Sequence, residues 1–161
     1  MIQGKGQFIW AANRIHDGDP ELIAQDAKDA GLSHVLIKFA DGTGDYNVSV
    51  DLHAIIAALH ALGIEVWGWQ FVYGYTPFGE AAKAIEKWQD YDLDGWIVNA
   101  EGAYKNNPTA AVIYMSHIRP VIDKPIGLSS YRYPLEPYHP EFPWKASVSY
   151  THLTLPTILL V

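Results

Sequence analysis

The sequence contains no cysteine, which excludes a disulfide framework and a thiolate zinc site. It also lacks any apolar run of about eighteen residues, so no membrane-spanning helix is predicted. Basic residues are few, because 11 Lys and Arg stand against 18 Asp and Glu. The resulting net charge of −7 argues against nucleic acid or an anionic membrane as a partner. A hydrophobic content of 49% indicates a globular protein.

The C-terminal stretch, residues 147–161, contains no Asp, Glu, Lys or Arg. From Val148 to Leu153 it resembles the translation of a transposase mosaic-end adapter. Such scars are set aside before a fold is predicted. We therefore expect residues 1–146 to form a partial catalytic-type barrel domain and residues 147–161 to be a non-native tail. A genuine apolar C-terminal strand is the alternative.

Several motifs of enzyme sites are missing as well. Residues 12–18 read ANRIHDG, so no glycine-rich dinucleotide loop follows the first predicted strand. No G-x-S-x-G surrounds the serines, which argues against a serine nucleophile. There is no H-E-x-x-H and no compact carboxylate cluster, so neither a metal nor another cofactor is expected.

A repeating pattern of extended apolar runs and amphipathic helices organises what is present. Apolar runs lie in four segments spaced by roughly thirty residues, the length of a βα unit, and an earlier strand is predicted at 7–12. The four segments are 30–42, 62–74, 92–102 and 123–132. Helices are predicted between them, with Asp19 and Asp51 as N-caps and Gly31 and Gly63 as stops. The order βαβαβαβαβ predicts an α/β protein with a parallel sheet.

Two parallel architectures fit this order, a doubly wound open sheet and the first five strands of a truncated (βα)8 TIM barrel. The strand ends carry a different polar set each time, such as Lys38, Gln70 and Asn99 with Glu101. Barrels build their sites in this way, from the C-terminal ends of several strands. We therefore favour the partial barrel.

Glu101 is the first candidate for chemistry. It follows the run from Trp96 to Ala100, and strand alternation puts Ile97, Asn99 and Glu101 on one face. A carboxylate at the mouth of a barrel can act as general acid, general base or nucleophile. A helix N-cap or a salt bridge with Lys105 is the structural alternative.

Lys38 interrupts an otherwise apolar strand. Because burying an unpaired ammonium is costly, Lys38 must emerge at the mouth or meet a carboxylate, with Glu101 and Asp41 as candidates. A Schiff-base lysine is a further interpretation. Other polar and aromatic side chains near the strand ends are expected to bind substrate: Trp69, Gln70, Asn99, Tyr131 and Arg132. The inward face of the strand that carries Trp69 and Gln70 is left open.

A family resemblance rests on five stretches: GQFIW, LSHVLIKFADGTGDYN, GIEVWGWQFVYG, GWIVNAEGAYK and IGLSSYRYP with YHPEFPW. Together they cover about residues 4–145 and resemble bacterial barrel proteins related to glycoside hydrolases, in outline the family 25 lysozyme-type muramidases. In that family pattern the corresponding strand ends Asp-x-Glu, and its Glu is the catalytic acid. The resemblance assigns that role to Glu101, while Asn99 departs from the acidic residue.

These observations predict an O-glycosyl hydrolase that acts on a bacterial polysaccharide or peptidoglycan. Glu101 would be the general acid/base, and its partner would be Asp41, Asp45 or an acid beyond the sequence. A carbohydrate is the expected partner. Two alternatives remain: a non-catalytic barrel that binds glycans or a protein, and a lyase or aldolase that uses Lys38.

Overall fold

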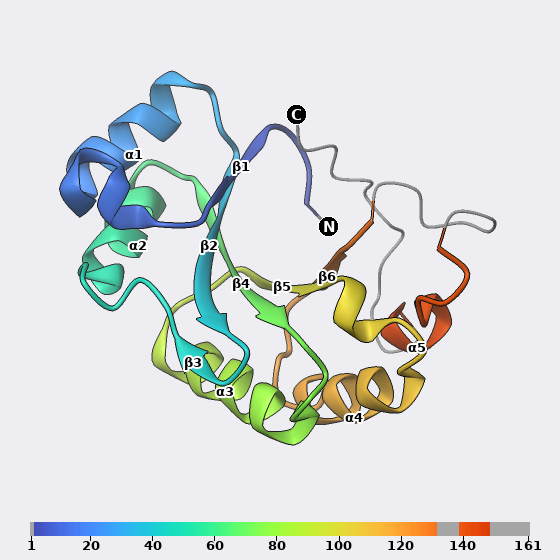
Figure 1. Cartoon of the computed structure of the whole chain (residues 1–161). Helices are drawn as coiled ribbons and strands as arrows, with labels where there is room; N and C mark the ends of the chain where they lie inside the picture. The colour runs from blue at the N-terminus through green and yellow to red at the C-terminus, as the bar shows by residue number, and fades with distance from the viewer. Residues whose placement is uncertain (1, 132–138, 149–161) are drawn as a thin grey trace.

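The computed structural model describes residues 2–131 and 139–148 and shows strands alternating with helices (Figure 1). In chain order the elements are β1 (Gly6–Ile9), η1 (Ala12–Arg14), η2 (His16–Gly18), α1 (Pro20–Asp29), β2 (His34–Asp41), β3 (Gly44–Asp45), α2 (Leu52–Ala61), β4 (Glu65–Val72), α3 (Pro77–Asp90), β5 (Gly95–Ala100), η3 (Gly102–Tyr104), α4 (Pro108–Ile118), β6 (Ile126–Ser129) and α5 (Trp144–Val148).

The sheet has the order β1-β2-β4-β5-β6, and all four pairings along it are parallel. The predicted α/β class and the five parallel strands in chain order are therefore confirmed. The two-residue strand β3 pairs antiparallel with β2 and was not predicted. It lies in a Gly-rich stretch too short to carry a strand pattern.

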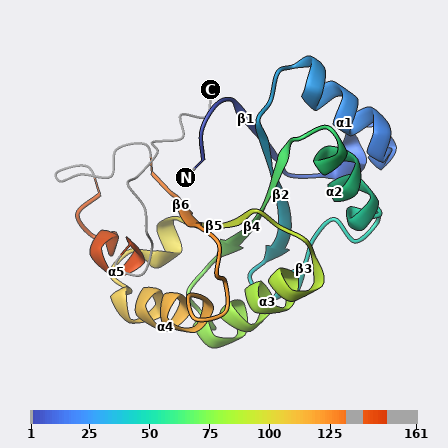
Figure 2. The ribbon, with the colours of Figure 1, turned by 180° about the vertical axis from the view of Figure 1, so that it is seen from behind.

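The helices pack on one face of this curved sheet (Figures 1 and 2). The apolar side chains that α1 to α4 bury all join one cluster with outward strand residues, among them Ile37, Val66 and Trp96. The opposite face carries a second cluster, which receives side chains only from strands and from Ile2 among the described residues. A doubly wound sheet would have helices on both faces, so this arrangement is the barrel-like one.

Local signals place the helices. The Asp19 carboxylate accepts a hydrogen bond from the Leu22 N–H at 2.9 Å, and Asp51 accepts one from Ala54 at 3.0 Å. Both predicted N-caps are therefore confirmed. The predicted stops are confirmed too, because Gly31 and Gly63 adopt φ values of +67° and +72° just past the helix ends.

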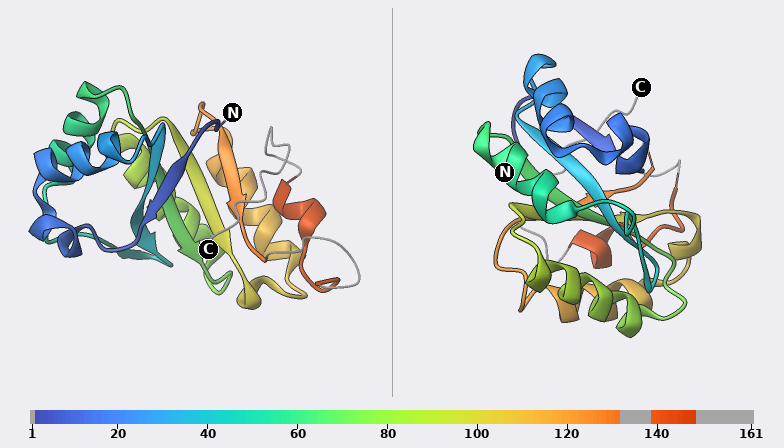
Figure 3. Two further views of the ribbon diagram at one scale, coloured as in Figure 1. Left: turned by 90° about the horizontal axis from the view of Figure 1, so that it is seen from above. Right: turned by 90° about the vertical axis from the view of Figure 1, so that its left-hand side faces the viewer.

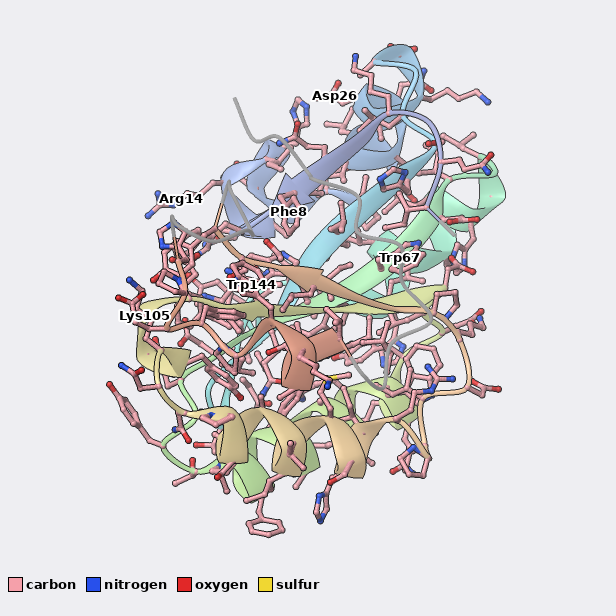
Figure 4. The ribbon with its side chains drawn as sticks, turned by 90° about the vertical axis from the view of Figure 1, so that its right-hand side faces the viewer. Phe8, Arg14, Asp26, Trp67, Lys105 and Trp144 are labelled. Atoms are coloured by element: carbon pink, nitrogen blue, oxygen red, sulfur yellow. The ribbon has the colours of Figure 1, made fainter. Side chains whose placement is uncertain are left out.

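Figure 3 shows the curved sheet from two further directions. On its inner face, which is the side away from the helices, paired residues form rows across the strands. Figure 4 labels Phe8 and Trp67 on this side, opposite α4. We name the rows from the N-terminal to the C-terminal end of the strands. The lower row is apolar, the middle row contains one lysine, and the upper row is mostly polar. These rows are Phe8–Leu36–Trp67–Gly95, Lys38–Trp69–Ile97–Gly127 and Asp41–Phe71–Asn99–Ser129. Polar groups thus gather at the C-terminal end of the sheet, as in barrel enzymes.

The first strand is shorter than the predicted 7–12. It ends at Ile9, because the backbone groups that follow bind the Asn47 side chain and not a neighbouring strand. The Asn47 side chain accepts a hydrogen bond from the Ala12 N–H at 2.9 Å and donates one to the Trp10 carbonyl at 3.0 Å. Among the described residues, no helix combines the length and the apolar character needed to cross a membrane. Of the predicted tail, Ser147 and Val148 belong to α5, and residues 149–161 lie outside the described part of the chain.

Candidate functional site

A β-bulge brings Lys38 and Asp41 to the same face of β2. Strict alternation would put residues three apart on opposite faces. The register between β2 and β4 shifts between Lys38 and Ala40, so that Lys38 pairs with Trp69 and Asp41 with Phe71. One extra residue in the strand therefore returns Asp41 to the inner face. The Lys38 ammonium then donates a hydrogen bond to Asp41 Oδ2 at 2.5 Å.

Three aromatic rings surround the Lys38 ammonium. Its Nζ lies 4.4 Å from the ring centre of Trp10, 4.1 Å from that of Tyr46 and 5.0 Å from that of Trp69. Lys38 is only 1% exposed, whereas Trp10 is 61% exposed. The Trp10 indole N–H donates to the Tyr46 hydroxyl, and the Trp10 and Trp69 rings meet edge to face. Lys38 therefore meets a carboxylate, as one prediction required, and is further stabilised by cation–π contacts.

The Asp41 carboxylate is held on both oxygens. Tyr73, just beyond β4, donates its hydroxyl to Oδ1 at 2.6 Å. Partial burial alone would raise the pKa of Asp41, but the hydrogen bonds from Lys38 and Tyr73 outweigh it and lower that pKa. The same bond to Asp41 raises the pKa of Tyr73 to about 12. Asp41 is thus an ionised carboxylate, suited to stabilise positive charge and unsuited to donate a proton.

Asn99 lies on β5, which pairs with β4, and Glu101 directly follows β5. Asn99 shares the upper row with Asp41, and its buried Oδ1 has no hydrogen-bond partner among the described residues. The β4–β5 pairing ends at Val72 and Ala100, so Glu101 and Tyr73 each directly follow the last paired residue of adjacent strands. Glu101 is exposed and occupies the N-cap position of η3, but its side chain makes no capping bond. Lys105 pairs with Glu141 at 3.7 Å instead. Neither structural role considered for Glu101 is therefore seen.

Tyr131 borders the same end of the sheet beyond β6. Its hydroxyl lies 3.3 Å from the point that a Cβ on Gly102 would occupy. Its ring stacks on His139 with centres 3.9 Å apart and lies 5.3 Å from the Lys105 ammonium, which Figure 4 labels beside η3. Tyr131 is thus close to the backbone that follows Glu101. Arg132, also expected at the site, lies outside the described residues.

The structure separates two predicted residues from this group. Gln70 is fully buried on the helix side of β4, where it bonds to Gly42, Glu80 and Tyr114, so it has no face toward a ligand. Alternation on β4 resolves the open choice, because Trp69 faces inward and Gln70 outward. Asp45, the alternative acid, is held by Lys83 at 3.1 Å and Lys87 at 2.8 Å from α3.

Sequence reasoning missed four aromatic residues as site components. Trp10, Tyr46 and Tyr73 contact the Lys38–Asp41 pair directly, and the exposed Tyr75 stacks on Tyr73 with centres 5.9 Å apart. Tyr73 and Trp10 each follow a strand end, so the rule that selected Glu101 selects them as well. Tyr46 gave no such signal. Within the described ranges, no group of three or more His, Asp or Glu side chains is placed to hold a metal ion.

The comparisons with known proteins concern the fold. No protein-family model matches the sequence, and no curated protein matches it either. The catalytic domain of the endolysin ply40, from a bacteriophage of Listeria monocytogenes, matches with a TM-score of 0.56 and 14% identity. That match covers 66% of this chain and 56% of the ply40 chain.

A second solved structure, the modular Cpl-1 endolysin complexed with a peptidoglycan analogue, matches with a TM-score of 0.57 and 15% identity. The match covers 90% of this chain and 41% of the Cpl-1 chain, so the protein spans less than two thirds of each solved chain. At such low identity the likeness establishes the fold. The chain therefore shares the barrel-like α/β fold of these two endolysins, and the predicted resemblance is confirmed at the level of the fold.

Proposed function

We propose that this protein is a glycoside hydrolase that acts on a bacterial cell-wall polysaccharide, with Glu101 as general acid/base. The observation that carries the proposal is the position of Glu101. It is an exposed carboxylate without a structural partner among the described residues, and it follows the end of β5. The adjacent strand β4 ends just before Tyr73, which binds Asp41. A general acid/base must reach the substrate, and the Glu101 side chain is exposed at the C-terminal end of the sheet.

Asp41 supplies the second carboxylate. Glycosidases use two carboxyl groups around an oxocarbenium-like transition state. The lowered pKa of Asp41 keeps it ionised, so it stabilises the positive charge that develops on the sugar. Lys38 holds one of its oxygens in place. Asn99 and the aromatic ring of Tyr131 position the sugar, because flat rings stack on the apolar faces of pyranosides. Trp69, which was predicted to bind substrate, is only 3% exposed and packs against the Lys38 ammonium instead.

The cell wall is the substrate source that the comparisons favour. The Cpl-1 endolysin was solved with a peptidoglycan analogue, and its fold is similar to that of this chain. Fold alone does not fix an activity, so the proposal stands on the site residues and takes only its substrate class from this likeness.

Glu101→Gln tests the assignment, since it keeps the shape of the side chain and removes the titratable proton. We expect the release of reducing sugar ends from purified peptidoglycan to fall by about 10²–10⁴-fold. Co-sedimentation with the same peptidoglycan should persist. Glu141→Gln, at another exposed Glu near the same end of the sheet, is the matched control and should retain activity. Unchanged hydrolysis in Glu101→Gln would reject the role of Glu101.

A non-catalytic glycan-binding protein is the second candidate. Both Asp41 oxygens are already engaged, and Asn99 stands where the resembled family has an acid. Glu101 thus supplies an unengaged carboxylate at the end of β5, where a two-carboxylate mechanism requires a second acid. Co-sedimentation by the unaltered protein without any release of sugar ends would favour this candidate. The Schiff-base alternative is disfavoured, because Lys38 is buried, ion-paired and enclosed by three rings that block a carbonyl substrate.

A further inference from the structure

A buried polar network lies behind the sheet, on the helix side of the candidate site. Its centre is Glu80 of α3, which is 1% exposed. The Glu80 carboxylate accepts hydrogen bonds from the backbone N–H of Tyr73 at 3.0 Å and of Gly74 at 3.0 and 3.1 Å. A helix side chain thus fixes the backbone of the loop that carries Tyr73.

Gln70 forms the other half of the network. Its side-chain amide donates to the Gly42 carbonyl at 2.7 Å and to the Glu80 carbonyl at 2.9 Å. Its own carbonyl accepts from the Tyr114 hydroxyl at 2.6 Å. Gly42 directly follows Asp41 in the chain, so Gln70 fixes the backbone next to that carboxylate.

The two halves act on the two partners of one hydrogen bond. Gln70 holds the chain beside Asp41, and Glu80 holds the chain at Tyr73, whose hydroxyl binds Asp41 on the opposite side of the sheet. Burying a carboxylate is costly, and an apolar side chain would fill the space without that cost. The Glu80 carboxylate offsets this cost by accepting hydrogen bonds from the two loop N–H groups, which would otherwise lack a partner.

We propose that Gln70 and Glu80 are positioning residues that set the distance between the Asp41 carboxylate and the Tyr73 hydroxyl, and so orient Asp41 toward the ligand. The significance of that orientation rests on the proposed function. The clamp itself, defined here as Gln70 and Glu80 with their bonds to Gly42, Tyr73 and Gly74, is testable without any ligand. It also gives Gln70 a role different from the substrate contact predicted from sequence.

Glu80→Gln tests the clamp, with the side-chain ¹³C resonance of Asp41 followed by NMR during acid titration. Glutamine presents a donor where one of the loop N–H groups needs an acceptor, so the loop shifts and the Tyr73–Asp41 bond weakens. The titration midpoint of Asp41 should then rise, since that bond favours the ionised form. Burial raises the pKa of Glu80, so Glu80 has already lost its charge in the pH range where Asp41 titrates. A rise in the Asp41 midpoint therefore reports the changed geometry.

Two reference variants calibrate the result. Tyr73→Phe removes the bond directly and sets the largest rise expected from this cause. Glu21→Gln, the same substitution on the exposed side of α1, should leave the Asp41 midpoint where it is. A midpoint in Glu80→Gln that stays at or below that of the unaltered protein would overturn the proposal.

Hydrogen exchange provides a second measurement in case Glu80→Gln fails to fold. In the unaltered protein the amides of Tyr73 and Gly74 should exchange far more slowly than an open loop. Exchange at the open-loop rate would also overturn the proposal. Because neither measurement uses a sugar, a failed clamp and a failed hydrolase assignment give separate results.

Discussion

At the scale of single residues, Asp41 links the site to the stability of the protein. Its pKa is lowered in the folded state, so it contributes stability above its unfolded pKa, about 3.9, and loses that contribution as the pH falls through the folded value. Asp41→Asn also leaves the Lys38 ammonium buried without its anion. That cost falls between about 1 kcal/mol for an exposed pair and about 3–5 kcal/mol for a buried one, because Asp41 is partly exposed.

We predict that the free energy of unfolding of Asp41→Asn differs from that of the unaltered protein by an amount that depends on pH. In urea unfolding, Asp41→Asn should be clearly less stable at pH 6, and the difference in unfolding free energy should shrink as the pH approaches 2. Asp123→Asn, at an exposed carboxyl, serves as the control and should show little difference at either pH. A difference in unfolding free energy that stays constant with pH would mean that Asp41 is not stabilised in its ionised form.

At the scale of elements, Asn47 joins the loop before α2 to the ends of two strands. Its buried side chain accepts from the Ala12 N–H and donates to the carbonyls of Trp10 and Lys38 at 3.0 and 2.9 Å. Its backbone has φ of +56°, which Asn tolerates better than most residues. This one side chain therefore holds Trp10 near the Lys38 ammonium.

Asn47→Ala should destabilise the protein by about 3–5 kcal/mol, from three hydrogen bonds worth about 1 kcal/mol each and the strain of Ala at positive φ. Asn47→Gly loses the same bonds without that strain and separates the two causes. Urea unfolding measures both variants. A loss below about 1 kcal/mol in Asn47→Ala would show that the loop does not depend on these bonds.

At the scale of the whole molecule, the net charge of −7 opposes binding to an anionic polymer. Cell-wall polysaccharide that carries carboxylates or phosphates should therefore bind more tightly as salt rises from low ionic strength to about 0.15 M, where the Debye length is about 8 Å. Co-sedimentation at the two salt concentrations measures this, with a neutral chitin-type polymer as the control. Binding that weakens with salt would indicate a local basic surface that dominates the contact.

The features predicted correctly from the sequence are those that depend on nearby residues. The caps at Asp19 and Asp51 and the five parallel strands depend on neighbouring residues and on an apolar pattern, and both are confirmed. The faces of β4 could not be assigned, because only the side on which the helices pack makes Trp69 inward and Gln70 outward. The contact between Trp10 and Tyr46 could not be predicted either, because it joins residues 36 positions apart and depends on the tertiary fold.

Because of the bulge in β2, the geometry of the site depends on the number of residues between Lys38 and Asp41. Lys38 and Asp41 share a face only because the strand holds one residue more than its partner between them. Loss of a single residue there would turn the carboxylate toward the helices while every functional side chain remained in the sequence. In related genes, insertions and deletions of one codon in this strand would thus matter more than most amino-acid replacements. An alignment that closes such a gap for convenience would hide the difference.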